Sequence, residues 1–147
     1  MLTKKITYTN YNDVEVTETF YFNLTKTEIM ELQIGTEGGI EDKLRKIAEA
    51  KNAGQLLKVF KELIIRSYGI KSDDGRYFKK GENFEYAKEF MESPAYDELI
   101  LDILGDTTGE KFKSFFLGIM PKEALEEISK RGGIDKLMEE EKANLVV

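Results

Sequence analysis

The feature that most constrains the fold is a two-residue alternation over residues 2–22. Its even positions are mostly apolar, and its odd positions are mostly threonine, lysine or glutamate. The run Asn10-Tyr11-Asn12-Asp13 divides this alternation into two arms. Because successive side chains of a strand point to opposite faces, the pattern predicts a β-hairpin over residues 1–22 with one apolar face.

The same parity limits how the two arms can pair. Residues directly opposite each other across a ladder share a face, so even positions must oppose even positions. A pairing of Ile6 with Val16 satisfies this rule and sets Lys4 opposite Glu18. Lys4 and Glu18 are the two charges on the apolar face, so we expect them to neutralise each other in this register.

Helix signals begin directly after the hairpin. Thr25 and Glu28 have the spacing of a capping box, in which each side chain binds the backbone N–H of the other residue. Gly35 can end that helix, and a second helix is expected over residues 40–48. The most hydrophobic stretch, residues 55–68, carries more than one apolar stripe and therefore predicts a central helix that ends at Gly69.

The remaining chain predicts more short helices. Residues 71–83 are polar and form either a surface loop or a small hairpin. Helical spacing recurs over residues 84–91 and 95–104, after a second candidate capping box at Thr107 and Glu110, and after Pro121. The predicted fold class is mostly α, with the N-terminal β-hairpin followed by about seven short helices packed as one irregular helical domain.

The domain prediction places one domain over residues 1–131, made of the hairpin (1–22) and a helical body (23–131). Gly132-Gly133 is a hinge candidate, so residues 132–147 are predicted to be a mobile C-terminal helix or tail. Removal of residues 133–147 is then expected to leave the fold intact.

The residue inventory excludes most catalytic chemistries. The chain has no Cys and no His, which removes thiol catalysis, disulfides, Cys/His zinc sites and histidine triads. The phosphate-loop and dinucleotide motifs are absent. Carboxylate pairs do occur, but 28 acidic residues produce such pairs by chance. We therefore predict that the protein is not an enzyme, with no catalytic, metal-binding or cofactor-binding residues and no cofactor.

The charge balance argues against two kinds of partner. Lys and Arg number 22 against 28 acids, for a net charge of −6. Nucleic-acid backbones and anionic membranes reward positive charge, so neither is expected to bind. No apolar run approaches the roughly 18–20 residues that a membrane span needs, and no secretory leader is visible. The protein is expected to remain where it is made.

Candidate partner-binding residues are apolar side chains whose place in a core is ambiguous. A lone hairpin is marginally stable, so its apolar face must cover either the helical body or a partner. The stripe beside Glu139-Glu140-Glu141 is either a solvated helix face or an interaction helix that orders on binding. The predicted set is Tyr8, Phe20, Phe22, Ile134, Leu137, Met138 and Leu145.

Five runs, taken in order, resemble the tail assembly chaperone family of long-tailed (siphovirus) phages and prophages. They are residues 20–31, 60–69, 71–78, 93–96 and the phenylalanine-rich segment that ends Gly118-Ile119-Met120-Pro121. The resemblance covers most of residues 1–121. It implies a protein of the bacterial host cytoplasm that binds the tape measure protein, keeps it soluble and promotes tail tube assembly around it. The implied partners are the tape measure protein and the tail tube protein, with self-association as a further expectation and no place in the mature virion.

Two other functions remain open at this point. A small acidic phage inhibitor of a host enzyme or nucleic-acid-binding protein would concentrate its acids on one face. Lys and Glu are instead interleaved over residues 58–62. A carboxylate-type hydrolase would need a deep pocket that holds two acids, one of them with a strongly raised pKa.

Overall fold

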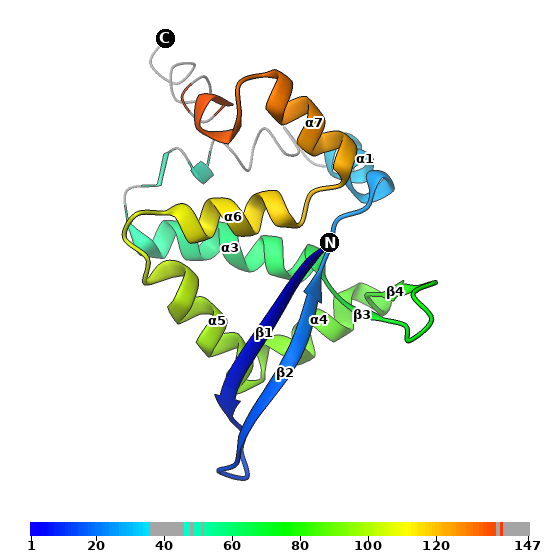
Figure 1. Ribbon diagram of the computed structural model, residues 1–147, viewed down its shortest axis with the longest axis vertical. Helices are drawn as coiled ribbons and strands as arrows, with labels where there is room; N and C mark the ends of the chain where they lie inside the picture. The colour runs from blue at the N-terminus through cyan, green and yellow to red at the C-terminus, as the bar shows by residue number, and fades with distance from the viewer. Residues whose placement is uncertain (36–45, 48, 51, 138, 140–147) are drawn as a thin grey trace. The chain divides into compact units, whose positions relative to one another are not determined.

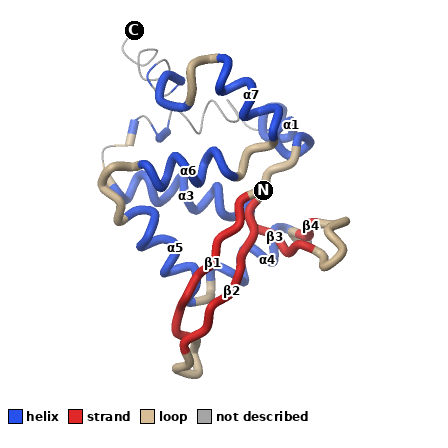
Figure 2. The backbone as a smooth tube through the Cα atoms, viewed as in Figure 1, coloured by secondary structure: helices blue, strands red, loops and turns tan. Residues whose placement is uncertain are grey.

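The computed structural model describes residues 1–35, 46, 47, 49, 50, 52–137 and 139 (Figures 1 and 2). The predicted second helix over residues 40–48 falls largely outside these described residues. The elements in chain order are β1 (Leu2–Thr9), β2 (Glu15–Phe22), α1 (Lys26–Gly35), α3 (Ala53–Ser67), β3 (Tyr68–Lys71), β4 (Phe78–Lys79), η1 (Glu82–Phe84), α4 (Glu85–Met91), α5 (Pro94–Leu104), α6 (Glu110–Gly118) and α7 (Lys122–Lys130).

Contacts along the chain form two compact units, each built from two segments. Unit 1 comprises Met1–Asn23 and Glu62–Ile119, and unit 2 comprises Leu24–Lys61 and Met120–Val147. Unit 2 extends across the predicted boundary at residue 132. The single domain over residues 1–131 stays a prediction.

Unit 1 contains a four-stranded antiparallel sheet in the order β1-β2-β3-β4. The N-terminal hairpin and the mostly helical character of the chain are as predicted. The sheet is a correction, because the hairpin was expected to stand alone and the central helix to continue to residue 68. Instead α3 ends at Ser67, and the backbone of Tyr68 and Gly69 pairs with Phe22 and Tyr21. Residues 71–83 contain the small hairpin that was one of the two alternatives.

The predicted register of the first hairpin is wrong by two residues. Ile6 lies opposite Glu18, and Tyr8 lies opposite Val16. Parity is preserved, so the apolar residues still share the inner face, but Lys4 lies opposite Phe20 and not opposite Glu18. Charge pairing therefore does not set this register.

The turn sets the register instead. The amide of Asp13 donates to the carbonyl of Asn10 (3.0 Å), and the amide of Asn10 donates to the carbonyl of Val14 (2.9 Å). Asp13 has φ 60°, the left-handed conformation that Asp tolerates better than most residues. A tight turn followed by a left-handed residue is a common three-residue hairpin loop. The Asn10 side chain reinforces it, because its Oδ1 accepts from the amides of Asn12 (2.9 Å) and Val14 (3.0 Å).

An aromatic cluster forms the core of unit 1 beneath β2. Phe22 is fully buried, and its ring lies 5.8 Å from Phe90 of α4 and 5.3 Å from Phe115 of α6, measured between ring centroids. Phe20 lies 5.0 Å from Phe90. Tyr68 stacks on Phe90 at 4.6 Å with 12° between the ring planes. Short helices and strands thus share one core, and the helices cover the apolar face of the hairpin.

The β3–β4 hairpin is held mainly at its base. A Cβ added to Gly69 would lie 2.6 Å from Cε2 of Phe78, so the ring of Phe78 occupies the space above this glycine. The ammonium group of Lys80 donates to the carbonyls of Asn23 (2.8 Å) and Arg66 (2.5 Å). It thereby joins the end of β2 to the last turn of α3, where a cation also complements the helix dipole.

Of the two predicted capping boxes, one is present in the structure and the other is not. The capping box is confirmed, because the amide of Thr25 donates to Glu28 Oε1 (2.9 Å) and the amide of Glu28 donates to Thr25 Oγ1 (3.1 Å). The second box is wrong: α6 begins after Gly109, with no side-chain cap at that position. Asp106 performs this role from outside the helix, since its Oδ2 accepts from the amide of Lys111 (3.0 Å).

Unit 2 contains α1, the first part of α3 (up to Lys61), α7 and the described part of the C-terminal segment. The ammonium group of Lys26 and Oε1 of Glu123 form an ion pair at 2.8 Å that links α1 to α7 on the surface. Among the helices in the described part of the chain, none is long and apolar enough to cross a membrane. Among the described residues of this unit, the buried apolar side chains are Leu24, Leu32, Val59, Phe60, Met120, Ile128, Ile134 and Leu137.

Candidate partner-binding surface

The predicted partner-binding aromatics lie mainly in the core. Phe20 is 9% exposed and Phe22 is 0% exposed, because Phe90 and Phe115 cover the face on which they lie. Tyr8 is half-buried, and its hydroxyl donates to the carboxylate of Glu18. That hydrogen bond, together with burial and the charge of Glu18, raises the pKa of Tyr8 to about 12. Tyr8 therefore stays a neutral donor at physiological pH.

The predicted C-terminal residues divide into two pairs. Ile134 and Leu137 are 9% and 4% exposed, so in this chain they face protein and not solvent. Met138 and Leu145 lie outside the described residues. Whether any of the seven predicted residues contacts a partner stays a prediction. The burial of Ile134 and Leu137 does change one expectation, since removal of residues 133–147 would delete two core side chains.

The most exposed apolar side chain of unit 1 lies at the turn of the first hairpin. Tyr11 is 81% exposed and Val14 is 52% exposed. Figure 1 shows this turn extending past the helices of the unit. Asp13 and Glu15 are exposed beside them, and residues 6–25 contain three acids and no Lys or Arg. We call Tyr11, Asp13, Val14 and Glu15 the acidic tip.

A second group of exposed apolar side chains lies on the β3–β4 hairpin. Tyr77 is 56% exposed and Ile70 is 43% exposed. Arg76 and Lys79 are also exposed, and the guanidinium of Arg76 lies 5.4 Å from the ring centroid of Tyr77. We call Ile70, Arg76, Tyr77 and Lys79 the outer surface of the β3–β4 hairpin, whose turn also carries the exposed acids Asp73 and Asp74. Sequence reasoning missed both surfaces, although large apolar residues inside predicted turns were a visible signal.

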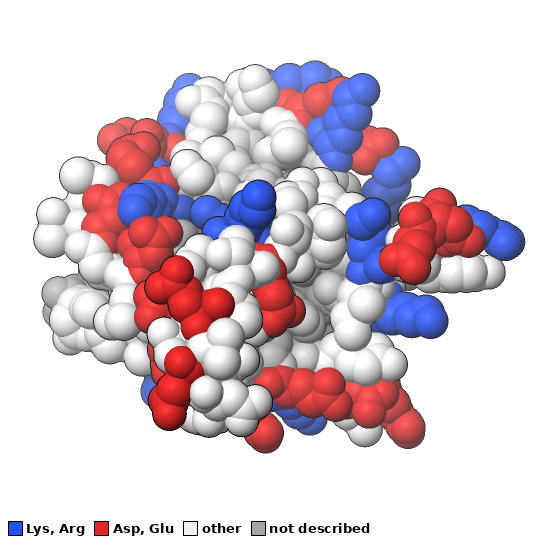
Figure 3. All heavy atoms as spheres, turned by 60° about the horizontal axis from the view of Figure 1, so that its bottom comes forward, with Lys and Arg blue, Asp and Glu red and all other residues white. Residues whose placement is uncertain are grey.

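The chain between the β3–β4 hairpin and α6 is strongly acidic. Residues 81–110 contain nine acids and only Lys88 as a basic residue. Leu101 of α5, 68% exposed, lies among them. Figure 3 brings the turn end of the first hairpin forward, and on this face the acidic side chains form separate patches with uncharged and basic atoms between them.

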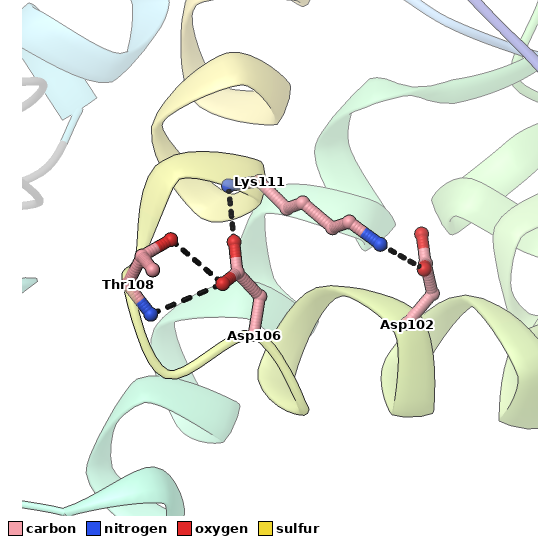
Figure 4. A network of polar contacts seen from close by, with 4 residues as sticks. All are labelled: Asp102, Asp106, Thr108 and Lys111. Atoms are coloured by element: carbon pink, nitrogen blue, oxygen red, sulfur yellow. Dashed lines mark hydrogen bonds and ion pairs between the residues drawn. The ribbon is translucent and has the colours of Figure 1, made fainter.

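A polar network joins the end of α5 to the start of α6 (Figure 4). Asp106 Oδ1 accepts from the hydroxyl (2.7 Å) and the amide (3.0 Å) of Thr108. The ammonium group of Lys111 lies 2.5 Å from Oδ1 of Asp102. The hydrogen bonds from Thr108 and the Lys111 amide hold the pKa of Asp106 below its ordinary value. These contacts fix the turn between two helices.

The shifted carboxylates differ from those of a hydrolase. Hydrogen bonds lower the pKa of Asp74, Asp106 and Glu123, and each of these side chains lies at the surface. A general acid needs the opposite shift, toward a pKa near the working pH. Within the described ranges, no group of three or more acidic side chains is placed to hold a metal ion.

Comparison with known proteins identifies the family. A family profile described as phage tail assembly chaperone matches residues 1–146. The chain belongs to the phage tail assembly chaperone family. No curated protein and no solved structure matches the chain. As a tail assembly chaperone, the protein has protein partners in tail assembly, and the family as a whole is not catalytic.

Proposed function

We propose that this chaperone binds the tape measure protein in the host cytoplasm, keeps it soluble and promotes assembly of the tail tube around it. The observation that carries the proposal is the family match, which extends over residues 1–146. On this proposal the tail tube protein is a second partner, and the chaperone leaves before the virion is complete.

The surface of the chain supports a holding role. A protein that keeps an aggregation-prone client in solution needs exposed apolar side chains that stay soluble because charges surround them. Tyr11, Tyr77 and Leu101 are large, exposed and close in sequence to charged residues. A helical client presents apolar anchors at every third or fourth residue, and such anchors are the natural counterpart of exposed apolar side chains.

The C-terminal segment is the part of the predicted contact set that can be tested cleanly. We propose that Met138 and Leu145, next to the run Glu139-Glu140-Glu141, contact the client. Removal of residues 138–147 leaves the buried Ile134 and Leu137 in place, and the melting temperature of the truncated chain reports folding separately from client binding. Removal of residues 133–147 deletes both and is expected to destabilise the protein.

The experiment is co-expression with the tape measure protein encoded in the same tail gene cluster, followed by affinity purification. We expect the tape measure protein to be insoluble alone and to co-purify in solution with this chain. The 138–147 truncation should retain its melting temperature but recover less tape measure protein. A tape measure protein that stays insoluble in the presence of the full chain would refute the proposal. Equal recovery with both chains would refute only the C-terminal contact.

A further inference from the structure

Strand β1 forms one edge of the four-stranded sheet, because β2 is its only partner among the described strands (Figure 1). It pairs with β2 over all eight of its residues in one continuous register, and it contains no proline. The opposite edge, β4, has only two residues. Proteins commonly protect an exposed edge by shortness, proline or a bulge, because the edge presents unpaired backbone groups. Strand β1 has none of these three protections.

The turn of the first hairpin determines which backbone groups of β1 face the free edge. The amide of Asn10 donates to the carbonyl of Val14, so these two residues form a hydrogen-bonded pair. Such pairs alternate with pairs whose N–H and C=O groups point away from the partner strand. In the register of the hairpin, the β1 residues of the second kind are Thr3, Lys5, Thr7 and Thr9. All four are exposed, and the described part of the chain places no hydrogen-bond partner at their outward backbone groups.

The charge of β1 selects the chemistry of a segment that can pair there. The strand carries Lys4 and Lys5 and no acid. Lys5 is exposed on the outer face and Lys4 is half-buried on the inner face, so each face of an added strand would meet one cation. Opposite charges on neighbouring strands stabilise a ladder, and like charges weaken it. The lysines therefore disfavour pairing with the β1 strand of a second copy and favour an acidic partner.

We propose that the free edge of β1 binds an extended, acidic segment of a partner protein, which adds to the sheet as a further strand. Backbone hydrogen bonds supply affinity in strand addition, and alternate side chains supply specificity. Here the outward backbone groups of β1 provide the hydrogen bonds, and two adjacent acids of the segment meet Lys4 and Lys5. The contact can be tested without tape measure protein, so its failure would leave the proposed holding function untouched.

The probe is a synthetic peptide, acetyl-Lys-Val-Thr-Val-Glu-Glu-Thr-Val-amide, designed to lie antiparallel to β1. In this direction its glutamates lie opposite Lys5 and Lys4, and its lysine lies beside the acidic tip. NMR of the full chain with millimolar peptide should show amide shifts and slowed hydrogen exchange that alternate along β1. The large changes are expected at Thr3, Lys5, Thr7 and Thr9, because the amides between them already pair with β2.

Two outcomes of this titration would overturn the proposal. The first is the absence of the alternating pattern at millimolar peptide. The second is the same pattern without peptide when the concentration of the protein is raised, because it would assign the edge to a second copy of the chain.

The charge selection is tested with the reversed peptide, acetyl-Glu-Val-Thr-Val-Lys-Lys-Thr-Val-amide. It should bind at least about fivefold more weakly than the acidic peptide. The net charge of −6 would favour the reversed peptide if attraction were nonspecific. A chain with Lys4→Glu and Lys5→Glu should show the opposite preference, which is not expected of a chain that has merely lost its fold. Equal binding of both peptides to the natural chain would contradict the selection of an acidic segment.

The edge itself is tested by a matched pair of proline substitutions. Thr7 and Thr17 lie opposite each other in a pair whose N–H groups point away from the partner strand, and their hydroxyls lie 2.8 Å apart. Thr7→Pro and Thr17→Pro therefore lose the same hydroxyl contact and leave the β1–β2 ladder intact, but only Thr7→Pro blocks the free edge of β1.

Thr7→Pro should weaken binding of the acidic peptide at least about tenfold, whereas Thr17→Pro should change it less than about twofold. The melting temperatures of the two variants show whether each is folded. Unchanged binding by Thr7→Pro, or an equal loss in both folded variants, would show that the peptide does not pair with the edge of β1.

Discussion

The two hairpins of unit 1 are stabilised in different ways. Strands β1 and β2 have eight residues each, and their inner face carries Phe20 and Phe22 into the core. Strands β3 and β4 have only four and two residues. The short hairpin depends on Gly69 beneath the Phe78 ring and on Lys80 at its base. The long hairpin is thus held by burial along its length, and the short one by a few contacts at its base.

The turns of the two hairpins also differ in chemistry. The first uses the amide oxygen of Asn10 to accept two backbone N–H groups. The second uses the carboxylate of Asp74 to accept from the hydroxyl of Ser72 (2.8 Å) and the amide of Arg76 (3.0 Å). The geometry is similar, but only the second acceptor can be protonated. Burial, base packing and turn chemistry can each be tested by one substitution.

The largest effect is expected where burial holds the long hairpin. Phe22→Ala removes a ring that is 0% exposed and in contact with Phe90 and Phe115. Truncation of a core phenylalanine to alanine costs about 3–5 kcal/mol, because it combines lost transfer free energy with a cavity. The free energy of unfolding from urea denaturation measures this loss.

The matched control lies at the other end of the same hairpin. Tyr11→Ala removes a ring that is 81% exposed, so its effect on the free energy of unfolding should stay within about 0.5 kcal/mol. Similar losses for the two variants would show that the inner face of the hairpin is not a core.

The next largest effect is expected at the base of the short hairpin. Gly69→Ala would place a methyl group 2.6 Å from Cε2 of Phe78, so the ring must move. Overpacking of this kind costs about 1–3 kcal/mol. Hydrogen exchange should speed up at the amide of Tyr77, which donates to Ser72 Oγ (2.9 Å), because the β3–β4 pairing loosens.

A double-mutant cycle isolates this contact. If the Phe78 ring is what Gly69→Ala displaces, the substitution should cost much less in a Phe78→Ala background. An unchanged cost in that background would assign the effect to strand backbone propensity and not to the ring.

These differences explain which parts of the fold the sequence predicts. Period two over residues 2–22 is long enough to identify the first hairpin and its inner face, and the Thr25 capping box is local, so both were predictable. The register was not predictable, because the turn with its left-handed Asp13 decides it. The expected pair does not set the register, since Lys4 lies opposite Phe20 and not opposite Glu18. Strand β3 is too short for periodicity and joins the sheet through tertiary contacts such as the stacking of Tyr68 on Phe90.

The candidate surface was less predictable than the fold. Phe20 and Phe22 were expected to meet either the helical body or a partner, and the sequence does not reveal that α4 and α6 supply the rings that cover them. Tyr11 and Tyr77 lie in turns, where periodicity carries no information about exposure. Their position on projecting hairpins emerges only when the helices are packed.

The smallest expected effect is a pH dependence confined to the turn of the β3–β4 hairpin. Hydrogen bonds from the amide of Arg76 and the hydroxyl of Ser72 hold the pKa of Asp74 below its ordinary value. A lowered folded-state pKa means that the carboxylate stabilises the turn fully above the unfolded pKa of about 4. This contribution is lost as the pH falls through the folded-state pKa. Acidification from pH 7 should therefore leave the turn unchanged until below about pH 4.

NMR titration of backbone amides distinguishes the two turns. The amide of Arg76 should shift as Asp74 is protonated. In an Asp13→Asn background, which removes the carboxylate of the first turn, the amides of Asn12 and Val14, which donate to the neutral side chain of Asn10, should not shift with it. Asp74→Asn keeps an acceptor but cannot titrate, so it should abolish the shift at residue 76. If Asn12 and Val14 shift in parallel with Arg76, acid acts on the whole hairpin sheet, and the chemical difference between the turns has no consequence for stability.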